Sequence, residues 1–144
     1  MRKLQERFDF IFNRIRHLGM PSLRVTLAIV FLWFGLLKIF GVSPVVGLIQ
    51  DTYSFMPTAT FIMVLGVWET IIGFGLLFKK CLRVTLVLLW AQMLGTFLSL
   101  VFNPSMFFSA GNPFLLTLEG EFLVKNLVLL SASLAIGSHE LKHD

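Results

Sequence analysis

Four long apolar segments constrain the fold of this chain more than any other feature. They cover about residues 23–40, 58–78, 82–102 and 118–137, and each is 18 to 21 residues long. A tilted helix of this length crosses a hydrocarbon core of about 30 Å. The sequence therefore predicts an all-α integral membrane protein whose core is a bundle of four transmembrane helices.

The composition limits what else the chain can be. Of its 144 residues 56% are hydrophobic and 14% are charged, whereas soluble domains have about 45–50% apolar and roughly 25% charged residues. The spans and their connections use nearly all the residues, so we expect no separate soluble catalytic domain. The net charge of +4 comes mostly from basic residues beside the apolar segments, where they direct topology. The expected partner is the lipid bilayer, and nucleic acid is not an expected partner.

Residues 1–20 form a separate region before the transmembrane domain, which we place at 21–138. Apolar residues recur there every three or four positions, at Leu4, Phe8, Ile11, Ile15 and Leu18. This pattern predicts a basic amphipathic helix that lies on the cytoplasmic membrane surface and ends at Gly19 and Pro21. A docking helix for a partner protein is the alternative. We expect no cleaved signal peptide, because the next apolar run is long and lacks a small-residue cleavage pattern.

The distribution of basic residues predicts the orientation. Six of the twelve Lys and Arg residues lie at or before Arg24, three lie between the second and third spans, and Lys142 lies in the tail at 139–144. The other two connections contain none, so both termini should be cytoplasmic. In the first of these connections, residues 45–50 could form a short re-entrant or interfacial turn.

A short repeat is consistent with two related helical hairpins. The pentapeptide LRVTL occurs at residues 23–27 and again at 82–86, each time at the start of an outward-going span. Such a parallel repeat would have its axis along the membrane normal. Chance similarity between two apolar segments is the alternative.

Polar residues within or at the head of the apolar segments are the candidate site. They are Lys38, Glu69, Gln92, Glu119, Glu121, Lys125 and Asn126. Helical rise places the members within the spans in one band, slightly outward of the bilayer midplane. Small residues share a helix face with several of them, which predicts that they point into the bundle. We expect Glu69 to pair with Lys38 or with Lys125, and Glu121 to pair with Lys125 at the i,i+4 spacing.

Two interpretations of this band remain open. The charges could only hold the helices together, with Lys38 reaching the outer interface, or they could line a pocket open to the outside. The expected walls of such a pocket are Phe31, Phe34, Trp68 and Phe97. The aromatic external connections could admit a quinone-like or lipid-like ligand laterally, or could simply form an aromatic belt on the membrane.

The sequence contains no metal, haem or nucleotide signature. His17, His139 and His143 all lie at the cytoplasmic edge rather than in a span, which argues against haem ligation between helices. Cys81 is the single cysteine, so neither an intrachain disulfide nor a CxxC pair can form.

Three motifs resemble one known family. GLLK at residues 35–38, WETIIG at 68–73 and EGEFLVKN at 119–126 are similar to the DoxX-like family of small four-helix bacterial inner-membrane proteins, with the resemblance covering about residues 22–138. It implies a location in the bacterial inner membrane. It also implies shared polar positions at Lys38, Glu69, Glu119, Lys125 and Asn126, with no catalytic role to transfer to them.

The family name derives from a subunit of a thiosulfate:quinone oxidoreductase, and other members resemble membrane partners of redox or stress-defence systems. The resemblance thus implies a membrane subunit or accessory protein with an oxidoreductase partner, and a quinone as the expected cofactor or ligand. Any enzymatic role would be that of a subunit, and a homo-oligomer is compatible with the sequence. The alternatives are a small proton-linked transporter and a membrane chaperone or assembly factor.

Overall fold

The computed structural model describes residues 2–44, 46–47, 50 and 58–142, and its regular structure there is helical. The long helices are α1 (Arg2–Ile39), α3 (Thr58–Phe78), α4 (Leu82–Phe102) and α5 (Leu118–Glu140), and two short 3-10 helices, η1 (Pro104–Met106) and η2 (Ser109–Gly111), lie between α4 and α5. Each long helix is apolar and long enough to cross a membrane. The predicted all-α fold with four membrane-spanning helices is confirmed.

The bounds of α3 and α4 agree with the predicted second and third spans. Helix α5 begins where the fourth span was predicted and runs three residues beyond residue 137, to Glu140. The predicted turn at residues 45–50 lies largely outside the described residues.

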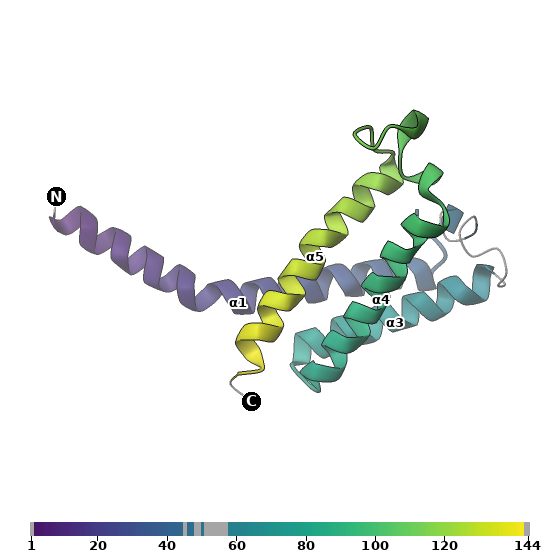
Figure 1. Cartoon of the computed structure of the whole chain (residues 1–144). Coiled ribbons are helices and arrows are strands. Elements are labelled where there is room, and N and C mark those ends of the chain that lie inside the picture. The colour runs from purple at the N-terminus through teal and green to yellow at the C-terminus, as the bar shows by residue number, and fades with distance from the viewer. Residues whose placement is uncertain (1, 45, 48–49, 51–57, 143–144) are drawn as a thin grey trace.

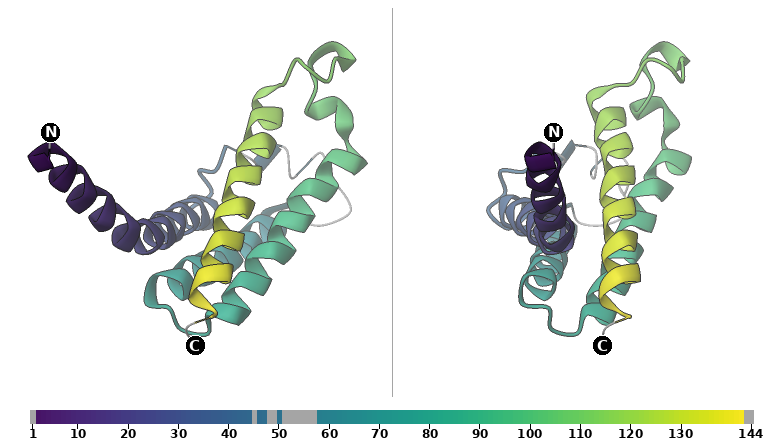
Figure 2. Two further views of the ribbon diagram at one scale, coloured as in Figure 1. Left: turned by 60° about the vertical axis from the view of Figure 1, so that its left-hand side comes forward. Right: turned by 90° about the vertical axis from the view of Figure 1, so that its left-hand side faces the viewer.

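Helix α1 is longer than the sequence predicts. It continues through Gly19 and Pro21 as one helix of 38 residues, so the prediction that a first helix ends there was wrong. Proline in a helix removes one backbone hydrogen bond and crowds the preceding turn, and the usual result is a bend rather than a break when both flanks favour helix. Figures 1 and 2 show the first part of α1 projecting away from the other helices.

The first part of α1 is helical, as predicted, and every side chain from residue 4 to residue 19 is exposed. Its apolar side, with Leu4, Phe8 and Ile11 more than half exposed, packs against none of the other helices. Its position on a membrane surface stays a prediction.

The four helices form two antiparallel pairs (Figure 1). Helix α1 packs along α3, and α4 packs beside α5. The pairs lie close together where α3 turns into α4 and where α5 ends, and they diverge toward the opposite end (Figures 1 and 2). The connection that carries η1 and η2 lies at the diverging end (Figure 1).

Glycines allow the close approach of α1 to α3. A Cβ atom at Gly66 would lie 2.8 Å from the carbonyl oxygen of Gly35, and one at Gly73 would lie 2.6 Å from the Cγ of Leu32. Neither contact is tolerable for real atoms, so a larger residue would force the helices apart. The small residues beside Lys38 and Glu69 therefore mark the contact face of these helices, as expected from their spacing.

The hydrophobic core lies toward the end where the helix pairs converge. Its buried residues come from all four helices and are Leu27, Ala28, Phe31, Ile72, Leu76, Leu82, Leu86, Leu89, Met93 and Ile136. The outward faces carry many exposed apolar residues, such as Ile71, Val87 and Val128. Exposed apolar surface of this extent is what a bundle surrounded by lipid requires.

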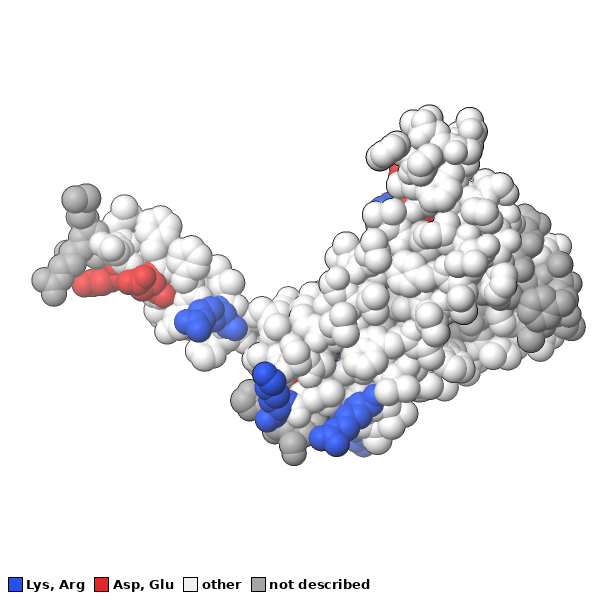
Figure 3. All heavy atoms as spheres, viewed as in Figure 1, with Lys and Arg blue, Asp and Glu red and all other residues white. Residues whose placement is uncertain are grey.

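A cluster of charges ties the helices together at the converging end. The Arg24 guanidinium donates to the carbonyl oxygens of Leu76 and Leu77 at the end of α3. The Glu140 carboxylate, 6% exposed, lies 3.3 Å from Nε of Arg24 and 2.8 Å from Nζ of Lys79. Figure 3 shows Lys and Arg gathered at this end, and a basic patch on the projecting part of α1 with acidic side chains nearer the N-terminus. From the sequence we considered Arg24 only as a topology signal, and the structure gives it a packing role as well.

Candidate functional site

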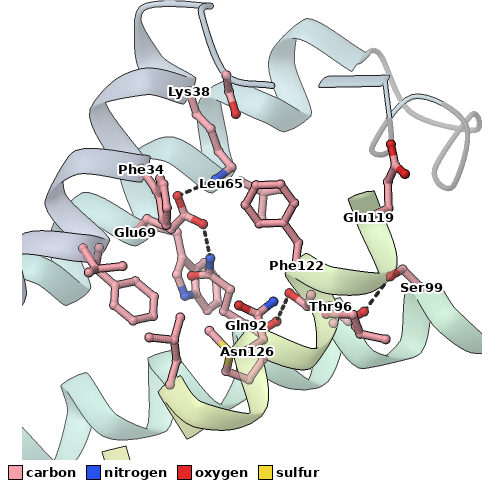
Figure 4. Close-up of a pocket in the computed structure, with 18 of the residues that line it drawn as sticks. Phe34, Lys38, Leu65, Glu69, Gln92, Thr96, Ser99, Glu119, Phe122 and Asn126 are labelled. Atoms are coloured by element: carbon pink, nitrogen blue, oxygen red, sulfur yellow. Dashed lines mark hydrogen bonds and ion pairs between the residues drawn. The ribbon is translucent and has the colours of Figure 1, made fainter. Parts of the chain in front are cut away.

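A pocket of about 320 Å³ lies between the helix pairs where they diverge, and residues of α1, α3, α4 and α5 line it. Aromatic side chains form much of its wall. They are Phe31, Phe34, Phe61, Trp68, Phe107 and Phe122. The chain thus encloses a mostly apolar cavity within its membrane-spanning part, with a few polar groups along it (Figure 4).

Three polar side chains form a hydrogen-bonded row along one wall of the pocket. The Lys38 ammonium donates to Oε2 of Glu69 at 2.7 Å, and the Gln92 amide nitrogen donates to Oε1 of the same carboxylate. Lys38 and Glu69 are only 9% and 7% exposed. From the sequence, Lys38 and Lys125 were both open as partners for Glu69, and Lys38 is the partner in the structure.

The orientation of the Gln92 amide follows from this pairing. An ionised carboxylate only accepts hydrogen bonds, so Gln92 must turn its NH₂ group toward Glu69. Its carbonyl oxygen Oε1 is then left buried, with no hydrogen-bond partner among the described residues. The wall therefore includes one buried hydrogen-bond acceptor that has no donor among the described residues.

Local packing holds this wall in place. The Trp68 indole nitrogen donates to the carbonyl oxygen of Leu88 at 3.1 Å, which fixes the ring between α3 and α4. The hydroxyl of Thr96 donates to the carbonyl oxygen of Gln92 at 3.1 Å, and the hydroxyl of Ser99 donates to that of Thr96. These two hydroxyls are satisfied within α4 and leave the charge network to Lys38, Glu69 and Gln92.

Helix α5 supplies the facing wall. Its start is fixed by Thr117, whose side chain accepts from the backbone nitrogen of Gly120 at 3.2 Å. A Cβ atom at Gly120 would lie 2.3 Å from the carbonyl oxygen of Phe107, so glycine is what lets the helix begin against the preceding connection. Glu119, Phe122 and Asn126 then follow on one face and line the pocket (Figure 4).

Glu119 and Asn126 are the two polar residues that α5 contributes to the pocket. Both are half-buried, and neither side chain has a hydrogen-bond or ion-pair partner within the described part of the chain. They are therefore available to a ligand.

Two other candidates on α5 lie outside the pocket. Lys125 and Glu121 have 67% and 56% of their side chains exposed, and they form the predicted i,i+4 pair with 3.6 Å between Nζ and Oε2. The Lys125 ammonium also lies 5.6 Å from the ring centre of Phe122. Successive residues on a helix are about 100° apart, so when Asn126 faces the pocket its neighbour Lys125 faces away.

The structure places three of the four predicted aromatic wall residues in the pocket lining. Phe31, Phe34 and Trp68 line the pocket, but Phe97 does not and packs against the hydrophobic core instead. Phe97 follows Gln92 by five positions, which turns it about 140° around α4 from the pocket face.

Sequence reasoning missed part of the lining, including Phe61, Leu65, Phe122 and Leu123. The spacing of 119, 122, 123 and 126 is a helical stripe and could have identified the face of α5. Phe107, which also lines the pocket, belongs to an aromatic external connection that the sequence indicated only as a group, because an irregular segment has no helical stripe. Within the residues that the structure describes, no three His, Cys, Asp or Glu side chains come together in a way that could hold a metal ion.

The fold and the pocket define a class: a multi-pass helical membrane protein with a polar network inside its bundle. A family model narrows this further, because the DoxX model matches residues 3–103. The chain belongs to the DoxX family. No curated protein and no solved structure matches it.

The matched region differs from the resemblance expected over residues 22–138. It begins within the first part of α1, which we had placed outside the family region, and it ends just after α4. Lys38, Glu69 and Gln92 lie inside the match, whereas Glu119 and Asn126 lie beyond it.

Proposed function

We propose that this DoxX family protein is a membrane subunit or accessory protein of a quinone-linked redox or stress-defence system in the bacterial inner membrane. Its pocket would bind the ring of a quinone or a related lipid-like ligand. The observation that supports this proposal is the pocket itself, about 320 Å³ in volume with six aromatic side chains in its lining. Small-molecule sites are typically cavities of about 300–1,000 Å³ with apolar walls and a few placed polar groups.

The charge balance of the wall favours an uncharged ring. Lys38 and Glu69 neutralise each other at 2.7 Å, so the deep part of the pocket carries no free charge. Asn126 offers a donor and an acceptor without a net charge. A flat, polar-substituted ring with an apolar tail fits this combination, since the tail can remain in the surrounding lipid.

The chain is proposed as a subunit because it does not carry a dithiol of its own. Cys81 is the single cysteine, and it is exposed at the turn between α3 and α4, far along the bundle from the pocket. Electrons would therefore come from an oxidoreductase partner, and this protein would supply the place where the quinone is held.

Copurification tests the proposal. The protein is purified in a mild detergent from its own membranes, and quinone bound per protein is measured by mass spectrometry. Phe122→Ala removes a pocket wall and should lower the bound quinone severalfold. Leu127→Ala, on a lipid-facing position of α5 that is 51% exposed, is the matched control and should leave it unchanged. Equal quinone in wild type and Phe122→Ala, or none in either, would reject the proposal.

A small proton-linked transporter is the second candidate, favoured by the ion pair buried between α1 and α3. Ionisable residues within spans often mark proton or substrate paths. Reconstitution into liposomes tests it, because Glu69→Gln should abolish any proton-coupled flux that the wild type shows. Flux that is absent, or that is the same in both proteins, removes this candidate. An assembly factor would instead change the abundance of a partner protein without flux or bound quinone.

A further inference from the structure

Residues 2–18, the N-terminal segment of α1, carry a surface that the rest of the described chain does not cover. We propose that this segment binds the cytoplasmic leaflet of the membrane and that its basic side chains select anionic phospholipid headgroups. The apolar pattern alone predicts a surface position, and the arrangement of charges around the helix adds the headgroup and the side that faces the lipid. The segment lies away from the pocket, so this binding does not depend on the proposed function.

One side of the N-terminal segment is apolar along its length. Its five residues, each more than half exposed, are Leu4, Phe8, Ile11, Ile15 and Leu18. At about 100° per residue, all five fall within an arc of about 80° around the helix. A continuous exposed apolar side of this kind marks a contact with a partner or a membrane, so an apolar medium is expected to cover it.

The charged residues are sorted around this apolar side. Arg7 lies about 20° and Arg14 about 40° beyond its edge at Leu18. The two acidic residues, Glu6 and Asp9, lie about 140–160° from the centre of the apolar side. When the apolar side enters the acyl region, Arg7 and Arg14 therefore reach the headgroups, and both carboxylates turn toward the cytoplasm.

The charge that faces the membrane is positive. The N-terminal segment contains five Lys and Arg residues and two acidic residues, a net charge of +3, and the acidic residues are on the far side. Near an anionic leaflet each Lys or Arg strengthens binding about fivefold, whereas a zwitterionic surface gives no such gain. The complementary surface is therefore one of anionic headgroups.

The connection to the bundle places the N-terminal segment beside those headgroups. Helix α1 continues from it into the first span without a break, and Figures 1 and 2 show α1 bending where it leaves the bundle. Pro21 lies at this junction and accounts for a bend. Three residues later, Arg24 is bound to the end of α3 and to Glu140. A segment attached at this basic end has a higher effective concentration at the lipid surface than at a soluble partner.

Fluorescence quenching in the full-length protein tests the proposal. In a Cys81→Ser background, Ile11→Cys places a label within the apolar side, and Asp9→Cys places the same label on the opposite side. The protein is reconstituted into nanodiscs of phosphatidylcholine, alone or with about one-third anionic phosphatidylglycerol, and a lipid with a nitroxide on its acyl chain is the quencher. With phosphatidylglycerol, the label at residue 11 should be quenched severalfold more than the label at residue 9.

The lipid composition and the basic residues test the selection of headgroups. Without phosphatidylglycerol, quenching at residue 11 should fall about twofold or more. Salt at about 1 M, which shortens the screening length to about 3 Å, should produce the same fall in the mixed nanodiscs. Arg7→Gln combined with Arg14→Gln should do so as well. Lys80→Gln combined with Lys142→Gln, which removes two exposed charges outside the segment, is the matched control and should leave the quenching unchanged.

Three results would overturn the proposal in different ways. Equal quenching of the two labels would show that the segment is off the membrane, as expected if its partner is a protein. Shielding of residue 11 from water without quenching, in nanodiscs that hold several copies, would show that a second copy covers the apolar side. Strong quenching at residue 11 that is the same in both lipid mixtures and in the Arg7 and Arg14 variant would overturn the selection of anionic headgroups. Thermal melts that match the wild type show that the labelled variants keep the bundle.

Discussion

At the scale of single residues, each member of the ion pair between Lys38 and Glu69 stabilises the protein only while the other is present. The two groups are 9% and 7% exposed and 2.7 Å apart. Taking either charge out of water costs several kcal/mol, and the pairing offsets much of that cost. Loss of one partner therefore leaves the other charge buried and uncompensated, whereas loss of both removes the problem.

A double-mutant cycle measures this dependence. Glu69→Gln should lower the free energy of unfolding by about 3–5 kcal/mol because it strands the Lys38 ammonium. Adding Lys38→Met should restore more than half of the loss. Unfolding in mixed detergent micelles gives the three free energies, and a double variant as unstable as the sum of the single variants would contradict the pairing.

Lys125→Met is the control for this cycle. Lys125 is 67% exposed and pairs with Glu121 on the surface of α5, so its loss should cost at most about 0.5 kcal/mol. Its effect should also add to that of Glu69→Gln, because the two residues share no contact. A coupling of more than about 1 kcal/mol would place Lys125 inside the network.

The sequence was sufficient to predict that Glu69 has a cationic partner, but not which one. Charges within apolar spans must be paired, and helical rise placed three of them at one depth. The choice between Lys38 and Lys125 depends on the rotation of α5 about its own axis. A change of one position turns a side chain by about 100°, and that rotation is set by packing at Phe122 and Leu123 rather than by any local signal.

At the scale of secondary structure elements, the four spans could be predicted because the length of each apolar segment determines its helix. The sequence predicted a helix end inside α1 that the structure does not have. Gly19 and Pro21 are ordinary stop signals, yet α1 continues through both. Propensity is a weak signal when strong helical sequence lies on both sides. The LRVTL repeat also predicted less than it suggested, because the equivalent residues of its two copies lie in different surroundings. Arg24 is half-buried while Arg83 is exposed, and Thr26 is exposed while Thr85 is buried.

The contact between α1 and α3 yields a prediction at this scale. Gly66→Ala would place a Cβ atom 2.8 Å from the carbonyl oxygen of Gly35 and 2.9 Å from the Cβ of Lys38. The helices would have to separate, and the change should destabilise the protein by about 1–3 kcal/mol. It should also displace Lys38, so ligand affinity should fall together with stability.

Gly19→Ala is the matched substitution for Gly66→Ala. No described atom lies within 4 Å of a Cβ at Gly19, so alanine there should be neutral or stabilising by up to about 1 kcal/mol through its higher helix propensity. Thermal unfolding of the two purified variants is the measurement. If Gly66→Ala were as stable as Gly19→Ala, the close approach of α1 and α3 would be wrong.

At the scale of the whole molecule, charge and fold together predict the orientation in the membrane. The Arg24, Lys79 and Glu140 cluster and the exposed Lys80 and Arg83 lie at the end where the helix pairs converge. The connection that carries η1 and η2, residues 103–117, contains no Lys or Arg. Basic connections remain on the cytoplasmic side, so the pocket, at the diverging end, should face the outer half of the bilayer.

The single cysteine allows a first measurement of this orientation on the unaltered protein. Cys81 is exposed in the turn between α3 and α4, so a membrane-impermeant maleimide should fail to label it in intact spheroplasts and should label it after permeabilisation. In a Cys81→Ser background, Ser109→Cys places a thiol at an exposed position of η2 and should be labelled in intact spheroplasts. The reverse pattern would turn the pocket toward the cytoplasm, and its ligand would then have to enter from the inner leaflet.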